Sequence, residues 1–317
     1  MDNESGVPIL DFRKSNGIIL EEGSEGWKEM SKKVREAFES HGMFLLRCDE
    51  IPKELQNGMF TGIKSLFDLP EETKSKFTGK RVYRGYSSKS PALPNSQTFG
   101  IDDTFDPNET QSFTNLMWPE GNPNFCEALI SFSSEARELS SIILKMVVEG
   151  FGLPAKYFLE IEELCKGNDT RLTKYPLPKE TNDFAVTFVP HTDRSSLTFI
   201  SENEIQGLQL LQKSGNWVNV NVPPNGFIVM VGDILQAWSN GRFEAPIHRV
   251  AIKGNKDRYV FILFSFPKEE TFIKVPTELV DEEDHPLRYK IFSYEDYINF
   301  IKTVGTKLGA LEEFVGI

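Results

Sequence analysis

The sequence predicts an α+β protein with a mainly β core, a double-stranded β-helix or jelly roll, behind a helical N-terminal shell. Apolar residues in the first half of the chain recur at helical spacing. The second half carries many short apolar runs that are separated by turn residues, which is typical of a double-sheet jelly roll. No repeat or Pro-rich linker divides the 317 residues, so we expect one domain spanning 1–317.

The N-terminal part, about 1–168, is expected to be helical. Trp27, Met30, Val34 and Phe38 lie at helical spacing, and Gly42 is a suitable helix end. The elements expected next are a short buried strand, Met43–Leu46, a helix from about Glu54 to Phe67 and a long amphipathic helix from about Asn124 to Gly152. Between these two helices, residues 78–123 show no clear period and are rich in Gly, Pro, Ser and Asn. We expect this stretch to be a loop covering a pocket.

The jelly-roll core is expected at about 169–270, followed by a C-terminal segment at 271–317. Its predicted strands are Phe184–Val189, Leu197–Ile200, Leu208–Leu211, Trp217–Val220, Phe227–Val231 and Tyr259–Phe264. Gly232-Asp233 is interpreted as a turn before a strand rather than as a catalytic acid.

Composition limits the possible partners and compartment. The 35 Lys and Arg residues against 47 Asp and Glu residues give a net charge of −12. An acidic chain without a basic stripe argues against nucleic-acid and membrane binding. No apolar run approaches the ~20 residues of a membrane helix, and three scattered cysteines indicate a reducing compartment. We therefore expect a cytoplasmic monomer whose partner is a small-molecule substrate.

Three residues point to a metal site: His191-x-Asp193, and His248 further along the chain. Two imidazoles and one carboxylate form the facial triad of non-haem Fe(II) oxygenases, which leaves coordination positions open. Alternate residues on a strand point the same way, so His191 and Asp193 are both expected to reach one metal. The other two histidines, His41 and His285, are interpreted as a helix-end residue and a solvated residue. The acidic run at 281–284 is interpreted as a solvated surface rather than a metal cage.

Ordered landmarks along nearly the whole chain resemble plant 2-oxoglutarate- and Fe(II)-dependent dioxygenases. They are Val7–Phe12, Ser40–Phe44, Leu66–Pro70, Gly207–Gln209, Gly232–Gln236, Ser239–Gly241 and His248–Val250. Phe113–Asn122 and Glu278–Glu283 are similar to the AOP-like branch, which includes glucosinolate-modifying dioxygenases and deoxypodophyllotoxin synthase.

The resemblance implies a site for 2-oxoglutarate. Arg258, ten positions after His248, corresponds to the family arginine that binds the distal carboxylate, for which a planar guanidinium is well suited. Tyr175 corresponds to a tyrosine that helps to hold the co-substrate, and Thr173 stands where many relatives carry Asn. Val260 replaces the usual Ser or Thr of the family and removes one hydrogen bond, worth ~0.5–1.5 kcal/mol. We expect weaker 2-oxoglutarate binding, not another cofactor.

The implied function is oxidation of a small, largely apolar plant specialised metabolite or hormone, by hydroxylation or demethylation. Fe(II), 2-oxoglutarate and O2 would be required, with ascorbate in support. Oxidative ring closure or desaturation starts from the same hydrogen abstraction and stays an alternative, as does a metal- or ligand-binding barrel without turnover. The expected pocket walls are Phe188, Pro190, Leu197, Trp238 and Phe264.

Overall fold

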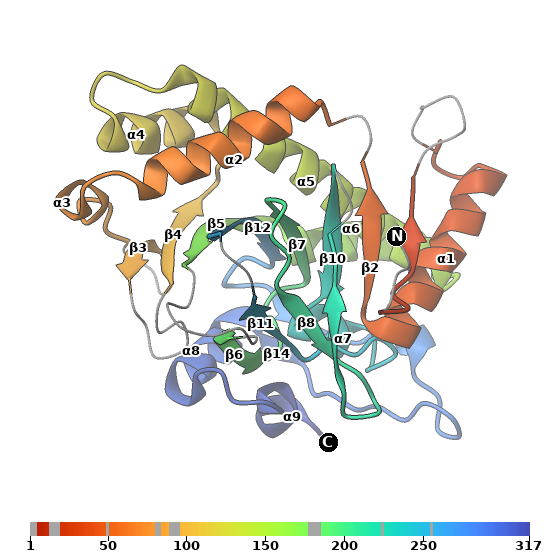
Figure 1. Cartoon of the computed structure of the whole chain (residues 1–317). Coiled ribbons are helices and arrows are strands. Elements are labelled where there is room, and N and C mark those ends of the chain that lie inside the picture. Colours follow the sequence, from red (N-terminus) through yellow and green to blue (C-terminus); the bar gives the residue numbers. More distant parts are fainter. Residues whose placement is uncertain are drawn as a thin grey trace.

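Two β-sheets face each other in the computed structural model (Figure 1), which describes residues 5–12, 20–48, 51–79, 84–88, 96–176, 185–222, 225–253 and 256–317. The larger sheet has the strand order β1 (Ile9–Leu10), β2 (Met43–Arg47), β10 (Gly226–Val231), β7 (Leu197–Glu202), β12 (Arg258–Phe266), β5 (Gly167–Tyr175), β4 (Gln97–Asp102) and β3 (Gly85–Ser88). The smaller sheet has the order β6 (Ala185–His191), β11 (His248–Ile252), β8 (Leu208–Leu211) and β9 (Trp217–Val220). The predicted double-stranded β-helix is confirmed.

Side-chain alternation along the strands separates two apolar clusters. On β12, Val260 and Ile262 belong to the cluster between the two sheets, which also contains residues of β8 and β11. The intervening Phe261 and Leu263 belong to the cluster on the opposite face of the larger sheet, together with the helices. Because successive residues of a strand point to opposite faces, the sequence of β12 determines which side chains line the space between the sheets.

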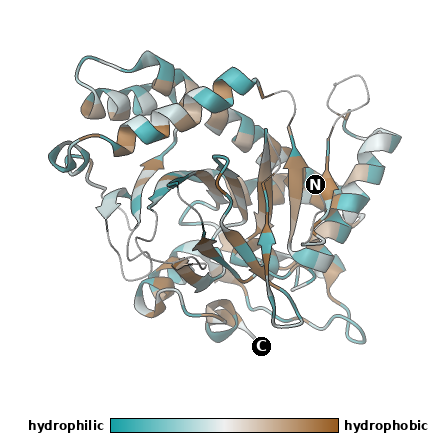
Figure 2. Cartoon of the chain, viewed as in Figure 1, coloured by the Kyte–Doolittle hydropathy of each residue, from teal (hydrophilic) through white to brown (hydrophobic). Residues whose placement is uncertain are grey.

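Helices cover the outer face of the larger sheet (Figure 1). The long α5 (Pro123–Gly150) contacts α1 (Glu25–His41), α2 (Lys53–Phe67), α4 (Pro107–Met117), α6 (Lys156–Glu162) and β12. The other α-helices of the described residues are α3 (Glu71–Lys74), α7 (Asp233–Trp238), α8 (Tyr294–Val304) and α9 (Ala310–Val315). The strands β13 (Phe272–Ile273) and β14 (Phe292–Ser293) form a separate pair. Figure 2 shows hydrophobic strands and hydrophilic residues on the outer helices. None of the helices in the described ranges has the length and apolar character of a membrane crossing.

Two predictions about local structure were wrong. Residues 78–123 were expected to be irregular, yet their described part contains β3, β4 and α4. Phe99 and Ile101 pack in the helix-side core with Gly100 between them, and these two apolar residues are too few among the surrounding Gly, Pro and Ser to give a clear strand signal. Gly232-Asp233 leads into helix α7, not into a strand. Phe184 of the first predicted core strand lies outside the described residues, and that strand is observed as β6.

Gly42 is required where α1 ends against the segment that leads to β11. Its φ is 65°, and a Cβ there would lie 2.2 Å from the Glu244 carbonyl oxygen and 2.9 Å from Pro246 Cδ. We expect Gly42→Ala to lower the free energy of unfolding by about 2–5 kcal/mol, from left-handed backbone strain plus overpacking. Gly23 has a φ of 79° with nothing within 4 Å of the added Cβ, so Gly23→Ala should cost only about 1–2 kcal/mol. Urea unfolding measures both losses, and equal losses would contradict the packing role of Gly42.

Candidate active site

The three predicted ligands meet at one end of the space between the sheets. His191 is the last residue of β6, His248 is the first of β11, and the two are direct partners in the strand register, with ring centroids 4.2 Å apart. Asp193 Oδ1 lies 3.7 Å from His191 Nε2 and 3.8 Å from His248 Nε2. Asp193 was expected to lie on the same strand as His191, but it follows the end of β6. The chain turns after His191, and this turn, not strand alternation, brings Asp193 to the histidines.

Each ligand has one side fixed by the protein and one side free for a metal. His191 Nδ1 donates to the Val189 carbonyl at 2.9 Å, and His248 Nδ1 donates to the Pro246 carbonyl at 3.0 Å, because a carbonyl can only accept. This leaves both Nε2 lone pairs available. Burial lowers the pKa of His191 to about 3, with His248 adding to the shift, so the imidazole is neutral. The donor set therefore fits a divalent metal such as Fe(II).

Thr198 and Asp233 hold the Asp193 turn, and neither was predicted from the sequence. The Thr198 hydroxyl on β7 donates to Asp193 Oδ2 at 2.6 Å, so Oδ1 is the oxygen that remains free. The Asp233 backbone N–H donates to the Asp193 carbonyl at 2.8 Å. The buried Asp233 carboxylate in turn accepts hydrogen bonds from Arg194 and from the Tyr297 hydroxyl of α8. Helix α8 thus braces the turn that carries Asp193.

Arg258, Tyr175 and Thr173 also lie inside the barrel. Arg258 is 1% exposed and is the register partner of Tyr175, and its guanidinium carbon lies 5.1 Å from the centre of the tyrosine ring. Burial raises the pKa of Tyr175; Arg258 opposes this shift and Asp193 adds to it. Tyr175 belongs to the apolar cluster between the two sheets. Thr173 lies 3.1 Å from the Thr98 hydroxyl.

Arg258 contacts an acidic residue that was not predicted from the sequence, Glu202. Arg258 Nε donates to Glu202 Oε2 at 2.6 Å, and Arg258 Nη2 contacts the same oxygen. Arg258 Nη1 is buried without a hydrogen-bond partner among the described residues. This Nη1 group can donate to one end of a dicarboxylate, although the other two guanidinium nitrogens, Nε and Nη2, already contact Glu202. Glu202 belongs to no motif, so only the strand register reveals it.

The expected pocket walls divide into two groups. The Phe188 ring centroid lies 4.0 Å from that of His191, and Phe264 is stacked 4.8 Å from the Arg171 guanidinium carbon. Pro190 is partly buried, in a stretch where β6 carries an extra residue relative to β11. Leu197 and Trp238 were wrongly expected to line the pocket. Both are buried in the helix-side core, because Leu197 faces outward on β7 and Trp238 ends α7.

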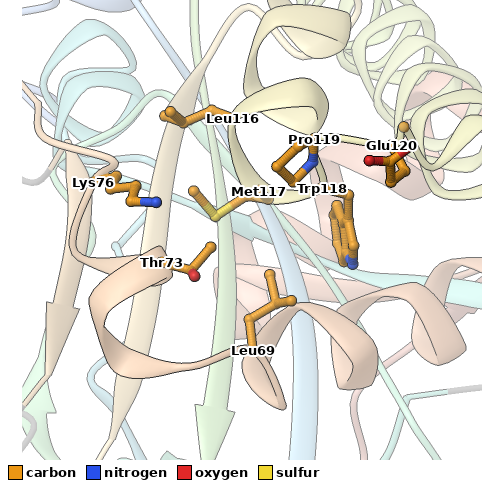
Figure 3. A pocket seen from close by; sticks show the side chains of 9 residues that line it. Leu69, Thr73, Lys76, Leu116, Met117, Trp118, Pro119 and Glu120 are labelled. Atoms are coloured by element: carbon orange, nitrogen blue, oxygen red, sulfur yellow. The ribbon is translucent and has the colours of Figure 1, made fainter.

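A surface hollow of about 280 Å³ lies elsewhere, between the segment around α3 and the end of α4 with the residues that follow it. Figure 3 shows the surrounding side chains of Leu69, Thr73, Lys76, Leu116, Met117, Trp118, Pro119 and Glu120. None of these residues is a candidate metal or co-substrate ligand. The hollow is therefore separate from the candidate active site.

Comparisons with known proteins agree with this geometry. The model of the 2OG-Fe(II) oxygenase superfamily matches residues 167–267, and the model of the non-haem dioxygenase in morphine synthesis N-terminal region matches residues 7–124. A relative named as a probable 2-oxoglutarate-dependent dioxygenase AOP1, from Arabidopsis thaliana, is 34% identical over 303 residues, covering 94% of this chain and 97% of the relative.

Two solved structures are similar over most of their length. The rice dioxygenase for auxin oxidation is 28% identical with a TM-score of 0.81, covering 98% of this chain and 100% of that one. The dioxygenase for auxin oxidation 1 from Arabidopsis thaliana, in a complex with 2-oxoglutarate, is 26% identical with a TM-score of 0.75, covering 88% and 99%.

Replacing any triad residue should abolish tight metal binding. We expect His191→Ala, His248→Ala and Asp193→Ala each to weaken Co(II) or Mn(II) binding sharply while the fold is kept, because each removes one of three protein ligands. Calorimetric metal titration measures the affinity. His285→Ala is the control, since that exposed imidazole pairs with Asp281 instead. A triad variant with unchanged affinity would refute the assignment of its residue.

The Thr198 hydroxyl should tune metal affinity without touching the metal. Thr198→Val keeps the volume but removes the donor to Asp193 Oδ2, and loss of such a supporting contact costs about 10–100-fold in metal affinity. Thr187→Val is the matched control, because the Thr187 hydroxyl contacts the Val250 carbonyl at 3.4 Å and no ligand. The same metal titration compares the two variants. Equal affinities would show that Thr198 does not orient Asp193.

Proposed function

We propose that this chain oxidises a small, largely apolar plant metabolite or hormone. The premise is its family: the chain belongs to the 2OG-Fe(II) oxygenase superfamily and is a 2-oxoglutarate-dependent dioxygenase. The observation that carries the proposal is the convergence of His191, Asp193 and His248 within 4.8 Å, inside the barrel that also holds Arg258. The relatives for auxin oxidation favour a substrate of hormone size.

The roles we propose for the residues follow from their contacts. His191, His248 and Asp193 would hold Fe(II), and Arg258 with Tyr175 would position the distal end of 2-oxoglutarate. When bound, Fe(II) and 2-oxoglutarate supply an oxidising chemistry that consumes O2, releases succinate and CO2 and breaks a substrate C–H bond. The apolar side chains between the sheets exclude water from this reaction. No protein nucleophile is needed, since the chemistry belongs to the metal and co-substrate.

Phe188 and Phe264 are the side chains we propose for substrate contact. Phe188 packs against a metal ligand, and Phe264 lies on the same face of β12 as Arg258 and Val260. Aromatic walls suit a largely apolar substrate. We propose hydroxylation or demethylation, with ring closure or desaturation as the alternative. A panel of plant phenolics, alkaloids and auxins read by mass spectrometry separates these outcomes, because hydroxylation adds oxygen whereas desaturation only removes hydrogen.

We also propose that the protein acts in the cytoplasm as a monomer, without nucleic-acid or membrane partners, and that ascorbate supports turnover. The acidic composition supports the part that concerns nucleic acid and membranes, and the scattered cysteines support a reducing compartment such as the cytoplasm. Light scattering of the purified chain and imaging of a fluorescent fusion would test it.

Succinate release should depend on Arg258 and Tyr175. With Fe(II) and ascorbate present, Arg258→Ala should strongly raise the 2-oxoglutarate concentration that gives half-maximal succinate formation, because the distal carboxylate loses its cation. Tyr175→Phe should raise it moderately, by removing one hydroxyl at nearly constant volume. Arg47→Ala is the control, since Arg47 is exposed at the end of β2. The measurement is a 2-oxoglutarate titration of succinate formation, and an unchanged requirement in Arg258→Ala would refute Arg258 as the anchor.

Val260→Ser tests the departure from the family pattern in the same titration. The added hydroxyl should tighten 2-oxoglutarate binding by up to about fivefold, as expected for one recovered hydrogen bond of about 1 kcal/mol. Affinity that stays constant or falls would show that the side chain at position 260 does not meet the co-substrate.

A further inference from the structure

The arginine assigned to the co-substrate already carries a carboxylate of its own chain. Glu202 and Arg258 are 5% and 1% exposed, and Glu202 Oε2 accepts from both Nε and Nη2 of the guanidinium. Two polar atoms of this pair remain buried without a hydrogen-bond partner among the described residues: Arg258 Nη1, a donor, and Glu202 Oε1, an acceptor. A ligand that offers one hydrogen-bond acceptor to Arg258 Nη1 and one donor to Glu202 Oε1 would therefore complete the hydrogen bonding of the pair.

The surroundings keep Arg258 in place. A Cβ on Gly207 would lie 2.9 Å from Arg258 Cδ and 3.1 Å from Nε, so the arginine side chain runs directly along the glycine. The Tyr175 ring lies against the guanidinium. Val260 is the register partner of both Glu202 and Thr173, and an isopropyl group supplies no hydrogen bond. The guanidinium is thus confined beside Glu202.

A second carboxylate at this site creates a charge problem. With the distal carboxylate of 2-oxoglutarate beside Arg258, one guanidinium would face two carboxylates in a buried environment. Like-charged carboxylates at close range resist simultaneous ionisation, and such a pair retains one shared proton. Thr173 offers little relief, because its hydroxyl is shared with Thr98, which also contacts the Leu172 carbonyl.

We propose, building on the proposed function, that 2-oxoglutarate binds here with uptake of one proton, which is shared between its distal carboxyl group and Glu202 Oε1 while the other carboxyl oxygen accepts from Arg258 Nη1. The proton comes from solvent and forms an O–H bond on one of the two carboxyl groups, and no bond of the co-substrate breaks. Succinate retains the distal carboxyl group, so the proton returns to solvent when succinate leaves.

The electrostatics around Glu202 are consistent with this arrangement. Burial raises the pKa of Glu202 above its ordinary value, although Arg258 and the nearby Val222 backbone N–H, which donates to Gln206 Oε1, oppose the shift. From β12 the charged group in contact with Glu202 is Arg258, and from β5 the Tyr175 ring lies against that guanidinium. Burial raises the pKa of Tyr175, so the phenol stays neutral. An arriving carboxylate adds a negative charge and raises the pKa of Glu202 further. Binding should therefore weaken as pH rises.

The proton is measured directly by calorimetry, without turnover. The full chain is saturated with Ni(II) in place of iron and titrated with 2-oxoglutarate near neutral pH, in phosphate and in Tris. Because these buffers differ in ionisation enthalpy, the difference between the observed enthalpies gives the protons taken up per ligand. We expect about one for the wild type. Glu202→Gln should take up none and should bind about tenfold more tightly near neutral pH, since removing the like charge is worth at least about one pKa unit.

Two controls make the outcome decisive. Glu204→Gln changes the same net charge on an exposed residue and should match the wild type. The monoamide of 2-oxoglutarate, whose distal carboxamide already offers one acceptor and one donor, should bind the wild type without proton uptake, a test that needs no variant. Binding of 2-oxoglutarate to the wild type without proton uptake would overturn the proposal and leave the proposed function intact. Failure of the wild type and both variants to bind 2-oxoglutarate would overturn the co-substrate assignment and this proposal with it.

Discussion

The direct pairing of His191 with His248 across β6 and β11 is the constraint on which the candidate active site depends. In an antiparallel pair, a slip of one residue turns a side chain to the opposite face of the sheet. The register would then separate the two imidazoles, whose ring centroids lie 4.2 Å apart. The irregular stretch of β6 near Pro190 sets this register. A proline cannot donate to the strand ladder, so it suits a bulge there.

The third ligand depends on contacts from distant parts of the chain. Asp193 is oriented by Thr198 of β7 through its side chain and by Asp233 through its backbone. Asp233 is held by Tyr297 of helix α8. Three separate segments thereby fix one carboxylate, while backbone carbonyls fix both histidines. Such preorganisation limits the rearrangement needed when a metal binds.

Buried charges are paired at two places along the strands β5 and β12. Arg258 pairs with Glu202, and further along β5 the buried Asp169 pairs with Arg84 and Arg171. Buried ion pairs carry a large desolvation cost and give little net stability, so their presence calls for another explanation. For Glu202 and Arg258, the two atoms that find no partner within the described part of the chain indicate an unfinished hydrogen-bond network. A ligand that completes the network gains hydrogen bonds without reorganising the pair.

The sequence by itself determined the fold class, the main helices, most core strands and the three candidate metal ligands that the structure brings together. These features depend on local periodicity or on residue type: α1, α2 and α5 are amphipathic, and the candidate metal ligands are a His-x-Asp and a later His in a chain of four histidines. Periodicity failed for β4, whose two buried apolar residues lie in a polar stretch. It also failed to tell which face of a strand lines the barrel, so Leu197 and Phe264 received the same prediction.

Only the tertiary structure decided which polar groups meet. Glu202 and Arg258 are separated by 56 residues, as Thr173 and Thr98 are by 75, and no local pattern links them. Their contacts arise because β7, β12, β5 and β4 are neighbours in one sheet with a fixed register. Sequence motifs identify residues whose chemistry stands alone, such as metal ligands. The protonation and hydrogen bonding of a buried group depend on its neighbours in space, which strand pairing alone brings together.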